Sequence, residues 1–189
     1  MQRMMPIRVL LLLFLAFGTN VFAQEAVTSL FEFSDEAEAA RWKVVNDGVM
    51  GGRSSGNGRL VNNQMKFSGR LSLENNGGFA SIRTRPAGSI GLAANSTIAM
   101  RVKGDGRQYT FNLYTPGRRV AFSYQTDFNT VAGQWVEVRL PVQNFVAHSF
   151  GRRLDGVPLD TTKVNAVGVL LGDKREGAFE IVIDWIRVE

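Results

Sequence analysis

The sequence predicts an all-β fold, a β-sandwich or jelly roll, and three observations lead to that prediction. Short segments alternate apolar and polar residues, and this period of two indicates strands because successive side chains point to opposite faces. Residues that tolerate a positive φ stand between these segments and suit tight turns. Helical periodicity is almost missing. Many short strands joined by such turns are typical of two packed antiparallel sheets.

One short helix is expected near the start of the domain, over residues 34–41. Ser34 is a suitable N-cap residue, because its hydroxyl can accept from a backbone N–H of the first turn. Asp35, Glu36 and Glu38 follow, and their negative charge favours the positive end of the helix dipole.

Six segments are expected to be strands because their apolar residues recur at every second position. They are residues 65–73, 97–103, 108–114, 120–124, 135–140 and 179–185. Turn residues separate them at 75–78, 104–106, 116–117 and 172–173. Residues 146–162 form the longest stretch without clear alternation, and they are expected to be a surface loop.

The first 23 residues have the pattern of a cleaved secretory signal peptide. Arg3 and Arg8 supply the positive charge, residues 9–17 are an unbroken apolar run, and residues 21–23 resemble a signal-peptidase site. The apolar run is too short for a membrane anchor, which needs about 20 residues. The prediction is therefore one β-sandwich domain over residues 24–189, periplasmic or secreted, with no stable membrane anchor.

Composition narrows the possible functions. Removing the signal lowers the formal net charge from +5 to +3. This excess of positive charge is too small to indicate a surface that binds nucleic acid. The chain has no Cys and only one His, His148, so a catalytic triad or a zinc site is disfavoured. Scattered carboxylates leave glycosidase chemistry open as an alternative, but the prediction is a protein that is not an enzyme. No cofactor and no metal are expected, although a loop-bound calcium ion is conceivable.

One glycine-dense stretch, residues 47–54, combines polar and apolar side chains. Its sequence, Asp-Gly-Val-Met-Gly-Gly-Arg-Ser, lacks the ending of a phosphate-binding loop. The glycines allow the backbone to approach another group closely. One interpretation is a bulge or crossover in which Asp47 binds nearby backbone N–H groups. The other is a surface that recognises a partner.

The chain resembles the complex I intermediate-associated protein 30 family over nearly the whole length that follows the signal. The resemblance starts at Trp42 and is most specific in residues 47–54. It continues through residues 67–69, 75–80, 104–107, Tyr109, Trp135, 140–141, Phe145, 151–152, Gly168, 177–179 and 183–186.

This resemblance implies a galactose-binding-like β-sandwich, and it implies no catalytic residues. Mitochondrial members of the family act as non-catalytic assembly factors for respiratory complex I. The present chain differs in carrying a secretory signal in place of a transit peptide. Because a bacterial periplasm lies opposite the compartment that corresponds to the mitochondrial matrix, this argues against a direct role in building the peripheral arm.

The prediction for function is thus an exported, non-enzymatic module that binds or helps to assemble a protein partner. The binding residues are expected on loops: Asp47, Met50, Arg53, Ser54, Asn75, Asn76, Asp105 and Arg107. Arg53 and Arg107 would hold a carboxylate or a protein partner by forked hydrogen bonds. The alternative is a carbohydrate-binding module. Its candidate residues are Tyr114, Tyr124 and Trp135 as stacking platforms, with Asn112 and Gln125 for sugar hydroxyls.

Overall fold

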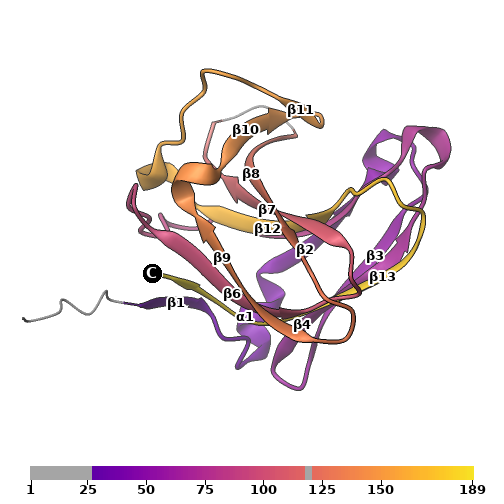
Figure 1. The fold of residues 1–189 in the computed structure, drawn as a ribbon, viewed down its shortest axis with the longest axis horizontal. Helices are drawn as coiled ribbons and strands as arrows, with labels where there is room; N and C mark the ends of the chain where they lie inside the picture. Colours follow the sequence, from indigo (N-terminus) through magenta and orange to yellow (C-terminus); the bar gives the residue numbers. More distant parts are fainter. Residues whose placement is uncertain (1–26, 118–120) are drawn as a thin grey trace, which may run out of the picture.

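The computed structural model describes residues 27–117 and 121–189, which form two antiparallel sheets packed face to face (Figure 1). The six-stranded sheet, here sheet A, has the order β3 (Ser55–Val61), β4 (Gln64–Leu71), β13 (Gly177–Val188), β6 (Thr97–Lys103) and β9 (Trp135–Pro141). Its sixth strand, β1 (Thr28–Phe31), pairs with the last residues of β13. The predicted all-β sandwich is confirmed.

The seven-stranded sheet, here sheet B, completes the sandwich. Its order is β11 (Arg152–Arg153), β10 (Val146–Ser149), β8 (Phe122–Asn129), β7 (Gln108–Tyr114), β12 (Ala166–Leu171), β5 (Ala80–Thr84) and β2 (Trp42–Asn46). The described helices are short: α1 (Glu36–Ala40) and the 3-10 turns η1 (Asp47–Met50), η2 (Glu74–Asn76), η3 (Val142–Asn144) and η4 (Thr161–Lys163). No helix in the described part of the chain is long and apolar enough to span a membrane.

The core lies between the sheets and follows the period-two pattern. In β7, Tyr109, Phe111 and Leu113 are fully buried, while Gln108 and Thr110, on either side of Tyr109, point to the other face. Alternation of this kind buries one row of apolar side chains from every strand, and burying such a row is the main driving force for folding. The strands of sheet A contribute matching rows, so one continuous core holds the two sheets together.

The N-terminal residues close one edge of this core with aromatic contacts. The rings of Phe31, Phe33 and Trp42 lie 5.2–5.8 Å apart, centroid to centroid. The predicted helix is present, but it begins one residue later than expected. Asp35, and not Ser34, is the N-cap, because its carboxylate accepts a hydrogen bond from the Glu38 N–H at 2.8 Å.

The structure corrects the predicted loop over residues 146–162, because β10 and β11 occupy its first part. Strands β1, β2, β3, β5 and β12 were also not expected. The predicted signal peptide, residues 1–23, lies outside the described residues, and so does Val120 of the predicted 120–124 strand.

Five connections meet at one end of the sandwich, which we call the loop end. The strand registers place them there: the last residues of β2 and β12 lie opposite Ala80, and Gln108 lies opposite Asn129. In sheet A, Gly177 lies opposite Leu71 in the same way. The loop end consists of residues 47–54, 72–79, 104–107, 130–134 and 172–176.

Candidate functional site

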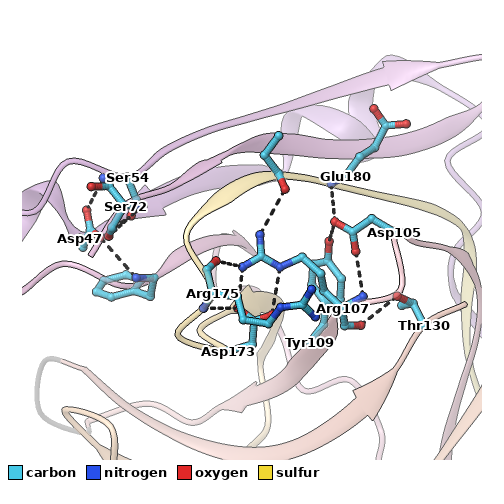
Figure 2. A network of polar contacts seen from close by, with 12 residues as sticks. Asp47, Ser54, Ser72, Asp105, Arg107, Tyr109, Thr130, Asp173, Arg175 and Glu180 are labelled. Carbon is cyan, nitrogen blue, oxygen red and sulfur yellow. Dashed lines mark hydrogen bonds and ion pairs between the residues drawn. The ribbon is translucent and has the colours of Figure 1, made fainter. Parts of the chain in front are cut away.

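Asp47 is fully buried beneath the loop end, where its carboxylate joins two connections (Figure 2). It accepts hydrogen bonds from Ser54 N at 2.9 Å and Ser54 Oγ at 2.5 Å. It also accepts hydrogen bonds from two backbone N–H groups of the other connection, Gly78 N at 2.7 Å and Phe79 N at 3.3 Å. A carboxylate can accept at both oxygens, so one side chain fixes residues 47–54 against residues 72–79.

Ser54 and Ser72 extend this contact. The Ser54 hydroxyl accepts from Ser72 N at 3.0 Å and also lies 3.2 Å from Ser72 O. Burial alone would raise the pKa of Asp47, but the hydrogen bonds from Ser54, Gly78 and Phe79 outweigh it and hold that pKa below its ordinary value. The carboxylate therefore stays ionised at neutral pH although water does not reach it.

Two glycines give the Asp47 side chain its room. A Cβ placed on Gly52 would lie 2.4 Å from Asp47 Cγ, and one on Gly77 would lie 2.7 Å from Asp47 Oδ2. Both approaches are far shorter than a van der Waals contact. Close packing around a buried carboxylate thus explains Gly52 and Gly77.

A second buried network, around Arg107, lies at the same end of the sandwich (Figure 2). Arg107 is 6% exposed, and its guanidinium donates two hydrogen bonds to Asp173, Nε to Oδ2 at 2.9 Å and Nη2 to Oδ1 at 2.6 Å. The same guanidinium donates to the backbone carbonyls of Arg175 and Ala178. Burial would raise the pKa of Asp173, but the hydrogen bonds from Arg107 and the Arg175 N–H hold it below its ordinary value.

Asp105 belongs to this network as well. Its carboxylate accepts from Arg107 N at 3.1 Å, from the Tyr109 hydroxyl at 3.1 Å and from Glu180 N at 3.0 Å. Thr130 lies on the other side, where its hydroxyl donates to Arg107 O at 2.9 Å and accepts from Gly106 N at 3.1 Å. The network leaves little capacity for an external ligand.

Above the Asp47 network, the two connections expose large apolar side chains. Val49 is 75% exposed, Met50 51% and Leu73 43%, and we call these three residues the rim. Beside them, Arg53 and Glu74 form an exposed ion pair of 3.1 Å that links the same two connections. Asn75 and Asn76 are exposed in η2 and have φ angles of 53° and 58°.

The eight residues predicted to bind therefore divide into two groups. All of them lie at the loop end, although they come from separate parts of the sequence. Met50, Arg53, Asn75 and Asn76 face solvent. The remaining four, Asp47, Ser54, Asp105 and Arg107, hold the loops in place with hydrogen-bonding groups that are already engaged.

Two contributors were missed in the sequence, Asp173 and Ser72. Asp173 stands in a Gly-Asp pair that signals a turn, and the partner that buries it lies 66 positions away. Local sequence carries no signal for such a distant pairing.

The candidate sugar-binding residues do not share one surface. Asn112, Tyr114 and Gln125 project from sheet B on the side away from the core, as their alternation with buried neighbours requires. Tyr124 is 1% exposed in the core and donates from its hydroxyl to Pro158 O at 2.8 Å. Trp135 belongs to sheet A, where Arg101 and Lys103 lie over its ring.

The single histidine of the chain, His148, a candidate for catalysis or metal binding, has a local partner. Its Nδ1 lies 2.9 Å from the Val146 carbonyl oxygen within the same strand. Within residues 27–117 and 121–189, no three His, Cys, Asp or Glu side chains are placed to hold a metal ion.

Residues 31–183 match the family described as Complex I intermediate-associated protein 30 (CIA30). A curated relative, the mitochondrial Complex I intermediate-associated protein 30 of Mus musculus, is 28% identical over 186 residues. The match covers 87% of this chain but 56% of the mouse protein, so the chain spans about half of that relative.

Solved structures with a similar fold include carbohydrate-binding proteins. The family 11 carbohydrate-binding module of Clostridium thermocellum superposes with a TM-score of 0.66 and 12% identity, covering 86% of this chain and 94% of the module. A structure of that module in complex with a β-1,3-1,4-mixed-linked tetrasaccharide gives 0.65 and 13%, with the same coverage. An agarase, AgWH50C, gives 0.62 and 11%, covering 86% of this chain and 24% of the enzyme. At these identities the likeness establishes the fold alone.

Proposed function

This chain belongs to the complex I intermediate-associated protein 30 family, and from that membership we propose that it acts without catalysis, as a module that binds a protein partner during assembly of a larger complex. The observation that carries the proposal is the rim: Val49, Met50 and Leu73 are exposed on connections that the buried Asp47 holds in place.

An exposed apolar cluster of this kind suits a protein interface. Protein interfaces combine an apolar centre with a polar border, and methionine is enriched in them. The rim supplies the centre, while the Arg53–Glu74 ion pair, Asn75 and Asn76 supply the border. Connections fixed in advance lose less conformational entropy on binding than flexible ones, so the Asp47 network favours affinity without touching the partner.

We place this activity outside the cytoplasm. The signal-peptide pattern of residues 1–23 supports export with cleavage after Ala23. Export of the full-length chain followed by N-terminal sequencing of the recovered protein tests this directly. The expected first residue is Gln24, and a protein that retains Met1 and stays in the cytoplasm would contradict the export part of the proposal.

Substitution of the rim tests the binding surface. Met50→Asp and Val49→Asp place a charge at the centre of the proposed interface and touch no core residue, so folding should be unchanged. Val61→Asp is the matched control, because Val61 is 37% exposed at the far end of β3. Cross-linking in periplasmic extract, followed by affinity capture, measures the partner.

The expected result is a specific partner that the wild type and Val61→Asp both capture, and that Met50→Asp captures at least tenfold less, since a central apolar contact contributes about 1–3 kcal/mol. Equal capture by Met50→Asp and the wild type would show that the rim is not the interface.

A further inference from the structure

The outward side of sheet B carries a polar cluster that is separate from the loop end. It consists of Arg83 on β5, Asn112 and Tyr114 on β7, and Ser123 and Gln125 on β8, and we call it the polar face. The strand registers bring these residues together. Gly168 of β12 lies opposite both Arg83 and Asn112, and Asn112 lies opposite Gln125.

Hydrogen bonds fix the orientation of its amides. Gln125 Nε2 donates to Ser123 Oγ at 3.0 Å, and Ser123 Oγ donates to Asn112 Oδ1 at 2.9 Å. Asn112 Nδ2 in turn donates to Thr110 O at 3.2 Å. Ser123 and Asn112 are 4% and 1% exposed, although they point away from the core. The Gln125 Oε1 atom has no hydrogen-bond partner among the described residues, so an acceptor with a known orientation remains available.

Arg83 and Tyr114 lie together over Gly168. The guanidinium carbon of Arg83 stands 5.6 Å from the centre of the Tyr114 ring. A Cβ on Gly168 would lie 2.8 Å from Arg83 Cβ and 3.2 Å from Tyr114 Cε2, so only glycine admits this contact without a shift. Burial raises the pKa of the Tyr114 hydroxyl, while the charge of Arg83 and its hydrogen bond to this hydroxyl act in the opposite direction. Like any tyrosine, it is a hydrogen-bond donor at neutral pH.

The charges around the polar face are unbalanced. Arg83 forms no ion pair with any carboxylate in the described residues. Lys43 lies opposite it on β2, and His148 lies opposite Ser123 on β10. The acid on this side of the sheet is Asp127, towards the loop end, where it accepts from Thr110 Oγ1 at 2.6 Å. A half-buried guanidinium without a carboxylate partner in the protein suits a ligand that carries a carboxylate group.

We propose that the polar face binds a saccharide that carries carboxylate groups. Arg83 pairs with a sugar carboxylate, while Gln125 and the Tyr114 hydroxyl bind ring hydroxyls, which both donate and accept. The buried Asn112 and Ser123 hold Gln125 in place. An acidic peptide fits less well, because peptide partners need apolar anchors and the centre of this face is made of amides and hydroxyls. The polar face is also distinct from the rim, so either site can fail without the other.

Calorimetry of the purified protein with tetragalacturonate tests the proposal. Cellotetraose supplies the hydroxyls without the carboxylates, and tetraglutamate supplies the carboxylates without the sugar. The variants are Arg83→Met and Gln125→Ala. Arg59→Met is the control, because Arg59 is an exposed arginine on β3 of sheet A, and it too forms no ion pair with a described residue.

The expected result is binding of tetragalacturonate at least tenfold tighter than binding of either comparison ligand. Arg83→Met should weaken it by tenfold or more and Gln125→Ala by roughly three- to tenfold, as loss of charged and neutral hydrogen bonds respectively. Arg59→Met should leave it unchanged.

Three results would overturn the proposal. They are no detectable binding of tetragalacturonate at millimolar concentration, equal binding of tetraglutamate, and equal losses in Arg59→Met and Gln125→Ala. Should Arg83→Met fail to fold, the half-buried Gln125 and the comparison ligands still decide the outcome.

Discussion

At the scale of single residues, Asp47 determines how the loop end is held. Its carboxylate accepts four hydrogen bonds from three residues while fully buried. A buried charge is costly unless it is satisfied in this way, and the backbone N–H groups around it are equally costly if they lose their acceptor. This residue therefore contributes to stability, and its effect on binding is indirect.

Replacing Asp47 by Asn keeps the shape and removes the charge. The new NH₂ group would face backbone N–H donors, so we expect a loss of about 2–4 kcal/mol in the free energy of unfolding. Urea denaturation followed by circular dichroism measures it. Asp155→Asn is the control, because that side chain is 85% exposed, and it should change stability by less than about 0.5 kcal/mol. A loss below about 1 kcal/mol for Asp47→Asn would contradict the structural role.

The acid stability of the protein follows from the same carboxylates. Asp47 and Asp173 have folded-state pKa values below the unfolded value of about 3.9. Each therefore contributes stability that is fully present above about pH 4 and is lost as the pH falls through its folded-state pKa. The urea midpoint should change little from pH 7 to pH 5 and drop below pH 4, less steeply in Asp47→Asn. Equal slopes in the two proteins would exclude Asp47 as a source of the acid sensitivity.

At the scale of elements, whether a position requires glycine depends on the atoms that surround it in the fold. Gly52 follows η1 and packs directly on Asp47, whereas Gly88 lies in a connection with no atom within 4 Å of a Cβ placed there. The two residues look alike in sequence, and only their surroundings distinguish them.

Gly52→Ala should therefore destabilise the protein, and Gly88→Ala should not. The added methyl at position 52 displaces the Asp47 carboxylate, so we expect a loss of about 1–3 kcal/mol, as for other overpacked sites. Thermal unfolding monitored by circular dichroism compares the two variants. Equal melting temperatures would indicate that the 47–54 connection adjusts to the methyl without cost.

The surroundings of a strand also decide whether its sequence predicts it. Strands β6, β7 and β9 begin at the predicted residues because their apolar residues alternate clearly. Strand β12, with the sequence Ala-Val-Gly-Val-Leu-Leu, is buried on both faces and so has no alternation to detect. Strand β3 is rich in glycine, a residue that weakens a strand signal.

The location of the candidate site was predictable from the sequence, but the burial of its residues was not. Glycine-dense turns marked where the loops lie, and strand order then brought them to one end. Burial was the part that could not be foreseen. Whether Arg107 faces solvent depends on Asp173, which β13 and β12 place beside it from a distant part of the chain.

At the scale of the whole molecule, the Arg107 network connects the two sheets. Arg107 lies on the connection from β6 of sheet A to β7 of sheet B, and Asp173 lies on the return connection from β12 to β13. Because Arg107 also donates to Ala178 O in β13, the network ties both crossings to sheet A.

Removing Arg107 should loosen this connection. In Arg107→Met the Asp173 carboxylate stays buried without its partner, so we expect a loss of about 3–5 kcal/mol. Arg101→Met is the control: its ion pair with Asp184 is partly exposed, and removing it should cost about 0–1 kcal/mol. Urea denaturation measures both variants. The double variant Arg107→Met, Asp173→Leu should regain part of the loss, and a further loss there would contradict the pairing argument.

Strand β13 has a consequence for the order in which the protein takes shape. It is synthesised after every other strand described here, yet it lies between β4 and β6 in sheet A and also pairs with β1. The ribosome must therefore finish residues 177–188 before sheet A can close, and until then β4 and β6 have no common neighbour. Sheet A therefore stays incomplete until the end of translation, whereas every strand of sheet B is synthesised before β13.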